Sequence, residues 1–591
     1  MLRTSQLLFC LLLGSFSLAS IAQDTQQNTP LTQDNIDPSI QSQGSEVLPD
    51  ESRDQLDLSM FDFSTVPSIE ELDEMLPEEI DDLLGLSPSY DIPVAARRSM
   101  RRLGLLDQSE GGLPEGSLAR QPQALVRAIL VGLKGPVLSR WGHILLRRSL
   151  VSRMRAPVGM TSVEFAGLRA AALNAMGEYH VARTFLQEID TTNWDSRVID
   201  AALDAYIATS DLVGLCPLVR LRPRLREDVQ WEMLSAICNS FAGEVVLGAR
   251  QLDSLLQAEA TAEIDILLAQ RLSGAAGVGR RAVKLEWTGV DSLSPWRFAL
   301  ANALGEEIPE NLLANIAPYY ERISATSPML AVEKRAQGAD RAAAEGIMSS
   351  QAIIDLYSQI YSHELPNGGP VDTAALLREA YTGQTIETRL SSLQRIWGDD
   401  PKTRYGRYVL TSHASALLSP SPSLLGSADD LLISMLSSGF DNDAESWASI
   451  VQPGGKAWAL IALSRNDRSV SISQNEISLY LEKDDSLDRR SSAYLLAGLA
   501  GLRRISEEDF QKLVLDLNFD LTRESAWSQA ISQAAQVSNA ALVSLLVGLG
   551  MQGDSWAEMT PRHIYFIVRS LADVGLDAEA RMIAAEALAR A

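Results

Sequence analysis

The segment Ala166-Gly-Leu-Arg-Ala-Ala-Ala-Leu-Asn-Ala-Met-Gly-Glu-Tyr-His-Val-Ala-Arg-Thr-Phe-Leu-Gln-Glu-Ile189 is rich in Ala and Leu and is interrupted at Gly177. Apolar residues resume at helical spacing after the glycine, which predicts two helices joined by a tight turn. The same order, Gly followed by small or apolar residues at +5, +9 and +12, recurs after Gly439 and Gly575. A helical hairpin is therefore the expected building unit of the chain.

The composition supports an all-α fold. Hydrophobic residues make up 46% of the 591 residues but aromatic residues only 6%, and runs rich in Val, Ile and Thr are few. A high hydrophobic content with few aromatic and β-branched residues is typical of helices that pack through small side chains. A chain of this length exceeds one compact core, so several domains or an extended array are expected.

Two glycine segments resemble a known repeat family. Gly177-Glu-Tyr-His-Val-Ala182 and Gly575-Leu-Asp-Ala-Glu-Ala580 are similar to the second helix of a tetratricopeptide-type hairpin. The resemblance implies an α-solenoid, a right-handed superhelical array of antiparallel helical hairpins, with glycine ending each first helix in a left-handed cap. The first helices lack the Trp and the Leu-Gly pair of that family, so a three-helix or irregular helical stack is the alternative arrangement.

The N-terminus has the pattern of a secretory signal peptide. Arg3 precedes an apolar run over residues 7–18, and Ser20 and Ala22 stand at the −3 and −1 positions of a cleavage site before Gln23. The run is shorter than the roughly 20 residues that span a bilayer. We expect residues 1–22 to be removed, leaving a periplasmic or secreted protein with no membrane span in the mature chain.

Residues 23–95 form a predicted disordered acidic arm. Gln, Asn, Asp, Glu, Ser and Pro dominate it, and Arg53 is the single base between residues 50 and 91. Ser68-Ile-Glu-Glu71 is a capping-box pattern and Pro77-Glu-Glu-Ile80 opens a second short turn, which together predict two short amphipathic helices within the arm. Helices this short need a surface to pack against, either a partner or the rest of the chain.

Arginines are concentrated directly after the arm. We predict that they form a basic face that the acidic arm partly covers; the alternative is that they decorate solvated helix faces. The members of this basic face are Arg97, Arg98, Arg101, Arg102, Arg140, Arg147 and Arg148. The whole chain carries a formal net charge of −25, which argues against nucleic acid as the partner.

The remaining chain is predicted to hold two helical-repeat parts, residues 96–365 and 366–591. Their predicted boundary falls at His363-Glu-Leu-Pro-Asn-Gly-Gly-Pro370, where Pro and Gly cluster, and Ser419-Pro-Ser-Pro422 is a second candidate. Two loops within one continuous array are the alternative. Cys216 and Cys238 are the two cysteines left after signal removal, and a hairpin between them could bring them together. An oxidising compartment makes them a candidate disulfide; two buried free thiols are the alternative.

One motif suggests an enzyme. Arg523-Glu-Ser-Ala-Trp527 with Gly550-Met-Gln552 resembles motifs of soluble lytic transglycosylases, and the resemblance implies that Glu524 is the general acid on the glycosidic oxygen. The spacing of the two motifs is longer than in that family, and too little chain follows Glu524 to complete a lysozyme-like domain.

Other chemistry is not supported by the sequence. Gly548-Leu-Gly-Met-Gln-Gly553 has the spacing of a dinucleotide loop, but residues 540–547 read as a helix where that loop needs a strand. Five scattered histidines and two cysteines do not form a zinc pattern. We expect no cofactor and no metal. The sequence favours a non-enzymatic scaffold that binds protein partners in the cell envelope; a peptidoglycan-active enzyme is the alternative.

Overall fold

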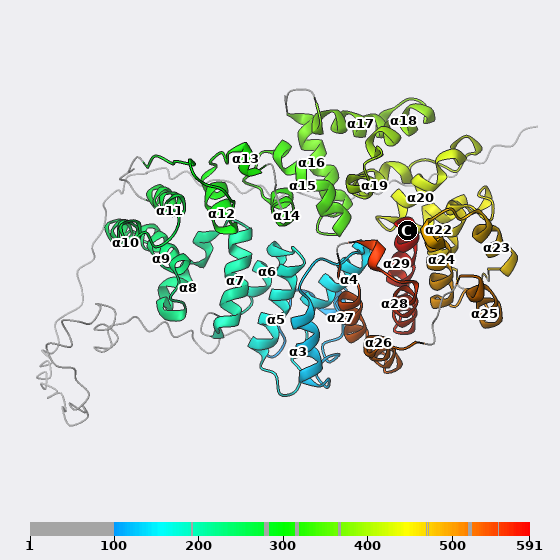
Figure 1. Cartoon of the computed structure of the whole chain (residues 1–591), viewed down its shortest axis with the longest axis horizontal. Helices are drawn as coiled ribbons and strands as arrows, with labels where there is room; N and C mark the ends of the chain where they lie inside the picture. Colours follow the sequence, from blue (N-terminus) through cyan, green and yellow to red (C-terminus); the bar gives the residue numbers. More distant parts are fainter. Residues whose placement is uncertain are drawn as a thin grey trace, which may run out of the picture. The chain divides into compact units, whose positions relative to one another are not determined.

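The computed structural model of the chain describes residues 100–190, 193–276, 283–313, 318–363, 368–467, 470, 472–517, 523–553 and 555–591. All of them belong to one compact unit, residues 92–591 (Figure 1). The predicted signal peptide and acidic arm lie outside the described residues, as do Arg97 and Arg98.

Regular structure in the described chain is entirely helical, which confirms the all-α class. The only strand-like pairings in these residues are isolated bridges, Leu103 with Met154, Leu106 with Ser152, and Val137 with Gln552. No helix among the described residues has the length and apolar character needed to cross a bilayer. The superhelical path of the array and its handedness stay predictions.

The helices follow one another along the described chain in three groups. The first group is α3 (Gln123–Gly132), α4 (Arg140–Val151), α5 (Ser162–Ala175), α6 (Tyr179–Leu186), α7 (Ser196–Ala208), α8 (Cys216–Leu221), α9 (Val229–Phe241), α10 (Val245–Gln257), α11 (Glu263–Ala275), α12 (Pro295–Leu304) and α13 (Glu310–Leu313). The second group is α14 (Pro318–Thr326), α15 (Val332–Glu345), α16 (Ser350–Ser362), α17 (Pro370–Thr382), α18 (Ile386–Trp397), α19 (Pro401–Ala416), α20 (Ala428–Leu436), α21 (Asp441–Glu445) and α22 (Lys456–Ser464). The third group is α23 (Gln474–Lys483), α24 (Arg490–Gly501), α25 (Glu507–Asp516), α26 (Ala526–Gln536), α27 (Ala540–Gly550), α28 (Pro561–Asp573) and α29 (Asp577–Ala589).

The three predicted glycine turns share one geometry. Gly177, Gly439 and Gly575 have φ of +85°, +83° and +81°, the left-handed region that glycine enters without strain. In each turn the next residue's N–H donates to the carbonyl five positions earlier, at 2.9, 3.1 and 2.9 Å. The turns join α5 to α6, α20 to α21 and α28 to α29, so the predicted left-handed caps are confirmed.

A fourth turn of this kind follows α9 and was not identified from the sequence. Gly243 has φ +96°, and the N–H of Glu244 donates to the carbonyl of Asn239 at 2.8 Å. At the +5 position stands Gly248, where a Cβ would lie 2.4 Å from the carbonyl oxygen of Ala236. Glycine at this position therefore lets α10 approach α9 closely.

The first and last helices of the described unit pack against each other. Helix α4 contacts both α27 and α29, and α3 contacts α27 (Figure 1). Main-chain bonding supports this junction, because the N–H of Leu138 donates to the carbonyl of Met551 at 2.9 Å. At Gly548 of α27, a Cβ would lie 2.5 Å from a methyl carbon of Leu146 on α4, so the two helices require glycine to meet. Helix α15 also crosses the predicted boundary at 365/366, since it packs against α17 and α19.

Candidate functional site

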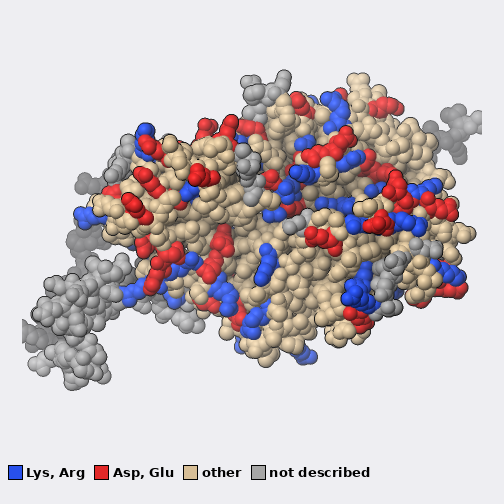
Figure 2. All heavy atoms as spheres, in the orientation of Figure 1, with Lys and Arg blue, Asp and Glu red and all other residues tan. Residues whose placement is uncertain are grey.

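The arginines of the predicted basic face occupy different environments. Arg102 is exposed and lies 3.4 Å from Glu115. Arg147 and Arg148 pair at 2.7 Å with Glu178 and Glu579, respectively. On the face of the unit in Figure 2, basic and acidic side chains are interspersed over the whole surface. The described members therefore act mainly in ion pairs within the unit.

Arg140 lies in the interior, with 3% of the residue exposed. Its guanidinium donates to the carbonyls of Ala343, Met348 (2.9 Å) and Ser437 (3.0 Å), at the ends of α15 and α20. Burial lowers the pKa of Arg140 to about 10. Arg140 is thus unavailable to a partner, because α4 is enclosed by α15, α27 and α29. It does not belong to an exposed basic face.

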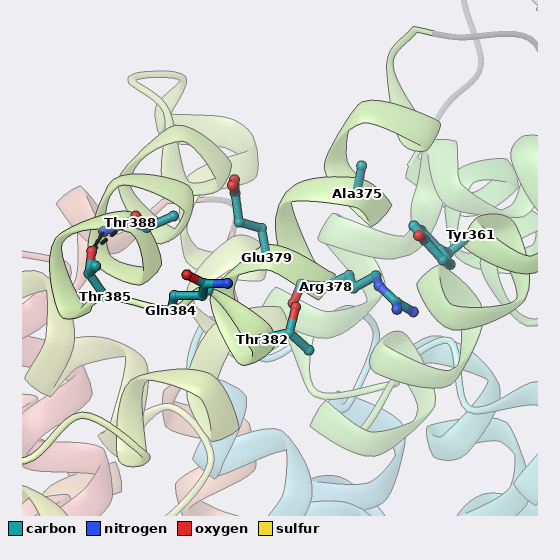
Figure 3. Close-up of a pocket in the computed structure, with 9 residues that line it drawn as sticks. Tyr361, Ala375, Arg378, Glu379, Thr382, Gln384, Thr385 and Thr388 are labelled. Atoms are coloured by element: carbon teal, nitrogen blue, oxygen red, sulfur yellow. Dashed lines mark hydrogen bonds between the residues drawn. The ribbon is translucent and has the colours of Figure 1, made fainter.

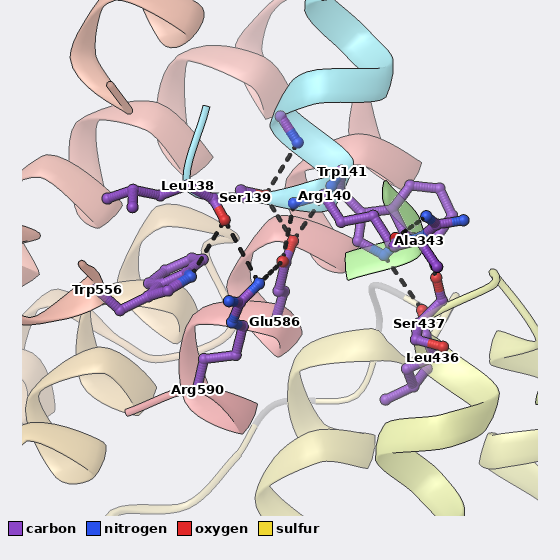
Figure 4. A network of polar contacts seen from close by, with 11 residues as sticks. Leu138, Ser139, Arg140, Trp141, Ala343, Leu436, Ser437, Trp556, Glu586 and Arg590 are labelled. Atoms are coloured by element: carbon purple, nitrogen blue, oxygen red, sulfur yellow. Dashed lines mark hydrogen bonds and ion pairs between the residues drawn. The ribbon is translucent and has the colours of Figure 1, made fainter. Parts of the chain in front are cut away.

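Glu586 of α29 is the centre of the polar network drawn in Figure 4. Its carboxylate accepts hydrogen bonds from the Ser139 hydroxyl (2.6 Å) and from the backbone N–H groups of Arg140 (2.8 Å) and Trp141 (3.2 Å). Arg590, one turn further along α29, donates to the same carboxylate at 3.3 Å. The carboxylate therefore satisfies free N–H groups at the positive end of α4. The carboxylate thus connects the N-terminal end of α4 to α29, near the two ends of the described unit.

A second buried carboxylate, Glu178, follows Gly177. It accepts hydrogen bonds from His143 Nε2 and from Arg147, both at 2.7 Å. Burial opposes ionisation of Glu178, but the hydrogen bonds and charges of His143 and Arg147 outweigh it, and the pKa is lowered. Arg147 also donates to the carbonyl of Gly346 at 3.3 Å, so this cluster ties α4 to two neighbouring turns.

Glu524 lies on the surface, directly before α26. Its carboxylate accepts a hydrogen bond from Gln529 at 3.0 Å. The other residues of the motif hold helices together: the Trp527 indole donates to the carbonyl of Leu546 at 2.9 Å, and a Cβ at Gly550 would lie 2.4 Å from the same ring. The structure thus gives these residues a role in packing α26 against α27.

Cys216 and Cys238 are joined as a disulfide between α8 and α9, with Cα atoms 5.1 Å apart. Cys238 is buried and Cys216 is half-buried. The described residues contain no group of three or more His, Cys, Asp or Glu side chains arranged to hold a metal ion.

An open depression lies over α16, α17 and α18 (Figure 3). Its first part, the α16–α17 cleft, has a volume of about 290 Å³; the described residues that line it include Ile354, Ser358, Ser362, Leu377 and Tyr381. Its second part, the α17–α18 groove, has a volume of about 540 Å³, and its lining includes Glu379, Gln384, Thr385 and Thr388. Tyr361, Arg378 and Thr382 line both parts, so the two are continuous.

Arg378 and Tyr361 form the centre of this site. The guanidinium carbon lies 4.9 Å from the centre of the Tyr361 ring, a cation–π contact, and 46% of Tyr361 is exposed. Among the described residues no carboxylate pairs with Arg378. Glu379 points away from Arg378 in Figure 3 and accepts a hydrogen bond from Ser392 at 2.7 Å.

No pattern in the sequence predicts this site. Tyr361 and Arg378 belong to different helices separated by the Pro- and Gly-containing segment that was interpreted as a domain boundary. Only the alignment of α16 beside α17 brings them together, and no local pattern encodes that register.

Comparison with known proteins gives no relative: no protein-family model, curated protein or solved structure matches the chain.

Proposed function

We propose that this protein is an exported, non-enzymatic helical-repeat scaffold of the cell envelope, and that it binds a protein partner in the depression over α16–α18. The N-terminal pattern of residues 1–22 supports export to the periplasm or the outside of the cell. The recurring glycine turns support a repeat array, whose superhelical surface is the usual binding part of such proteins.

The exposed pair of Arg378 and Tyr361 is the observation that carries the proposal. Arg and Tyr are enriched at the energetic centres of protein interfaces, because both offer a large planar surface together with hydrogen-bond donors. The depression is open along two helix junctions, which suits an extended polypeptide better than an enclosed small molecule.

No observation favours the enzymatic alternative over this proposal. A general acid in glycoside hydrolysis is ordinarily held in an apolar environment that keeps it protonated. Glu524 is exposed and bonded to Gln529, and its neighbours are engaged in helix packing.

Site-specific photo-crosslinking tests the proposal. A benzophenone amino acid replaces Ala375, an exposed residue that lines the depression, in cells that naturally make the protein. The matched control carries the same group at Ala352, an exposed residue of α16 outside the lining. We expect a discrete protein adduct from position 375 that position 352 does not give. Identical adduct patterns at both positions would contradict partner binding at this site.

A further inference from the structure

We propose that the α16–α17 cleft recognises a carboxylate on an extended polypeptide and that Arg378 is the residue that binds it. This inference rests on the proposed function, because it states the chemistry of the partner segment that enters the depression. The charge of the lining is the first argument. Arg378 is the one charged side chain among the described residues that line the cleft, and Asp and Glu are absent from that set.

The position of the guanidinium is the second argument. The cation–π contact holds the Arg378 guanidinium over the Tyr361 ring, and the exposed side chain keeps N–H groups that can donate to a ligand. A planar guanidinium binds a carboxylate through two parallel N–H bonds, and restricting the side chain in advance lowers the entropy lost on binding. An arginine held in this way, with no carboxylate partner among the described residues, selects an anionic group over a neutral one.

The hydroxyl groups of the cleft give the third argument. Ser358 donates to the carbonyl of Ile354 at 2.8 Å, Ser362 to that of Ser358 at 2.9 Å, and Thr382 to that of Arg378 at 2.9 Å. Because each hydroxyl hydrogen is already used, these oxygens are left to accept hydrogen bonds. The N–H groups of an extended peptide are the matching donors.

A glycan is the competing ligand and is favoured less. Sugar rings bind proteins by stacking on an aromatic face, but Arg378 covers one face of the exposed Tyr361 ring. The serine and threonine hydroxyls also cannot donate to sugar oxygens without losing their bonds to the helices. The apolar side chains of Ile354 and Leu377 instead supply a floor on which an aliphatic peptide side chain can pack.

Fluorescence anisotropy with defined peptides tests the inference on the mature chain. The first probe is Ala-Ser-Glu-Glu-Ser-Ala amide labelled with an uncharged BODIPY dye, so that its side chains supply the only carboxylates. The second is the Gln-Gln analogue with a free C-terminal carboxylate, and the third is that analogue as its neutral amide. We expect at least one acidic probe to bind and the neutral amide to bind about tenfold more weakly, the usual difference for a lost charged hydrogen bond.

Arg378→Gln is the decisive variant, because an exposed side chain is replaced without disturbing the core. Arg378→Gln is expected to weaken binding of the acidic probe by about tenfold or more. Arg378→Lys keeps the charge but not the planar guanidinium, so it is expected to cause an intermediate loss of affinity. Tyr361→Ala, which removes the platform, is expected to weaken binding as well. Arg395→Gln is the matched control, since Arg395 is an exposed arginine of the adjacent α18 that lines neither part of the depression.

Each result bears on the proposal. Binding of the side-chain probe identifies an internal acidic segment as the partner. Binding of the free-acid probe alone identifies a chain terminus. Either result supports carboxylate recognition if Arg378→Gln abolishes the binding. Equal binding of acidic and neutral probes, no binding of any acidic probe, or no effect of Arg378→Gln would overturn it. Displacement of the peptide by chitohexaose, with binding of chitohexaose itself unchanged in Arg378→Gln, would overturn it in favour of a glycan. If crosslinking from Ala375 persists in any of these cases, partner binding stands and carboxylate recognition alone fails.

Discussion

Ser139 donates its hydroxyl hydrogen to the carboxylate of Glu586 at 2.6 Å, although 447 positions of sequence separate the two residues. The bond joins the start of α4 to the end of α29, and both residues are buried. Long-range polar contacts of this kind hold the described unit together at its ends.

Loss of the Glu586 carboxylate is predicted to destabilise the unit. Glu586→Ala leaves the buried Ser139 hydroxyl and the N–H groups of Arg140 and Trp141 without an acceptor. We expect a loss of about 2–5 kcal/mol in the free energy of unfolding. Urea unfolding followed by circular dichroism measures it, with Glu387→Ala, an exposed glutamate of α18, as the control. Equal midpoints for the two variants would contradict the role of Glu586.

Glu178 is predicted to make the free energy of unfolding depend on pH in the acidic range. The pKa of this carboxyl is lowered in the folded protein from a reference value of 4.5, so at low pH the unfolded chain binds more protons than the folded one. The stabilisation is therefore complete above about pH 4.5 and is lost as the pH falls through the lower folded pKa. Unfolding free energies of wild type and Glu178→Gln, measured from about pH 6 to about pH 3, are expected to converge at the acid end. A constant difference across this range would show that the carboxyl is not the titrating group.

The Cys216–Cys238 bond is predicted to form in the exported protein. Thiol counting on the unfolded, unreduced mature chain should find no free thiol, whereas the reduced chain should show both. Replacing both cysteines with serine should lower the free energy of unfolding by about 2–4 kcal/mol, the usual effect of removing a disulfide. Detection of two free thiols without reductant would rule the bond out.

Glu524 is predicted to be dispensable for any hydrolytic activity. In a peptidoglycan zymogram we expect no clearing from either wild type or Glu524→Gln, because the carboxylate is exposed and hydrogen-bonded to Gln529, without the apolar surroundings that keep a general acid protonated. An active lysozyme in a neighbouring lane controls for substrate quality. Clearing by wild type that disappears in Glu524→Gln would establish the enzymatic alternative.

The helical turns could be read from the sequence because their cause is local. Gly177, Gly439 and Gly575 each end a run of helix-forming residues, and a left-handed backbone at that point favours glycine wherever the rest of the chain lies. Gly243 follows the same rule, and Gly248 and Leu252 at +5 and +9 would have identified it.

The role of each charged residue could not be read in the same way. Arg140 and Arg102 look alike in sequence, yet one is buried among the carbonyls of α15 and α20 and the other is exposed. That difference depends on helices that come hundreds of positions later. The pairing of Tyr361 with Arg378 likewise depends on how two helices align, which hydrophobic periodicity alone does not fix.

The packing of α4 against α27 and α29 sets the order in which this protein can finish folding. During synthesis from the N-terminus, α4 emerges long before the helices that cover it. The polar groups of α4 that are buried in the folded unit stay in contact with water until the helix after Gly575 has been synthesised. A product cut short before α29 lacks the Glu586 carboxylate and exposes apolar surface of α4, which is what proteases and chaperones recognise. Only a chain that includes α29 can therefore shield this surface of α4.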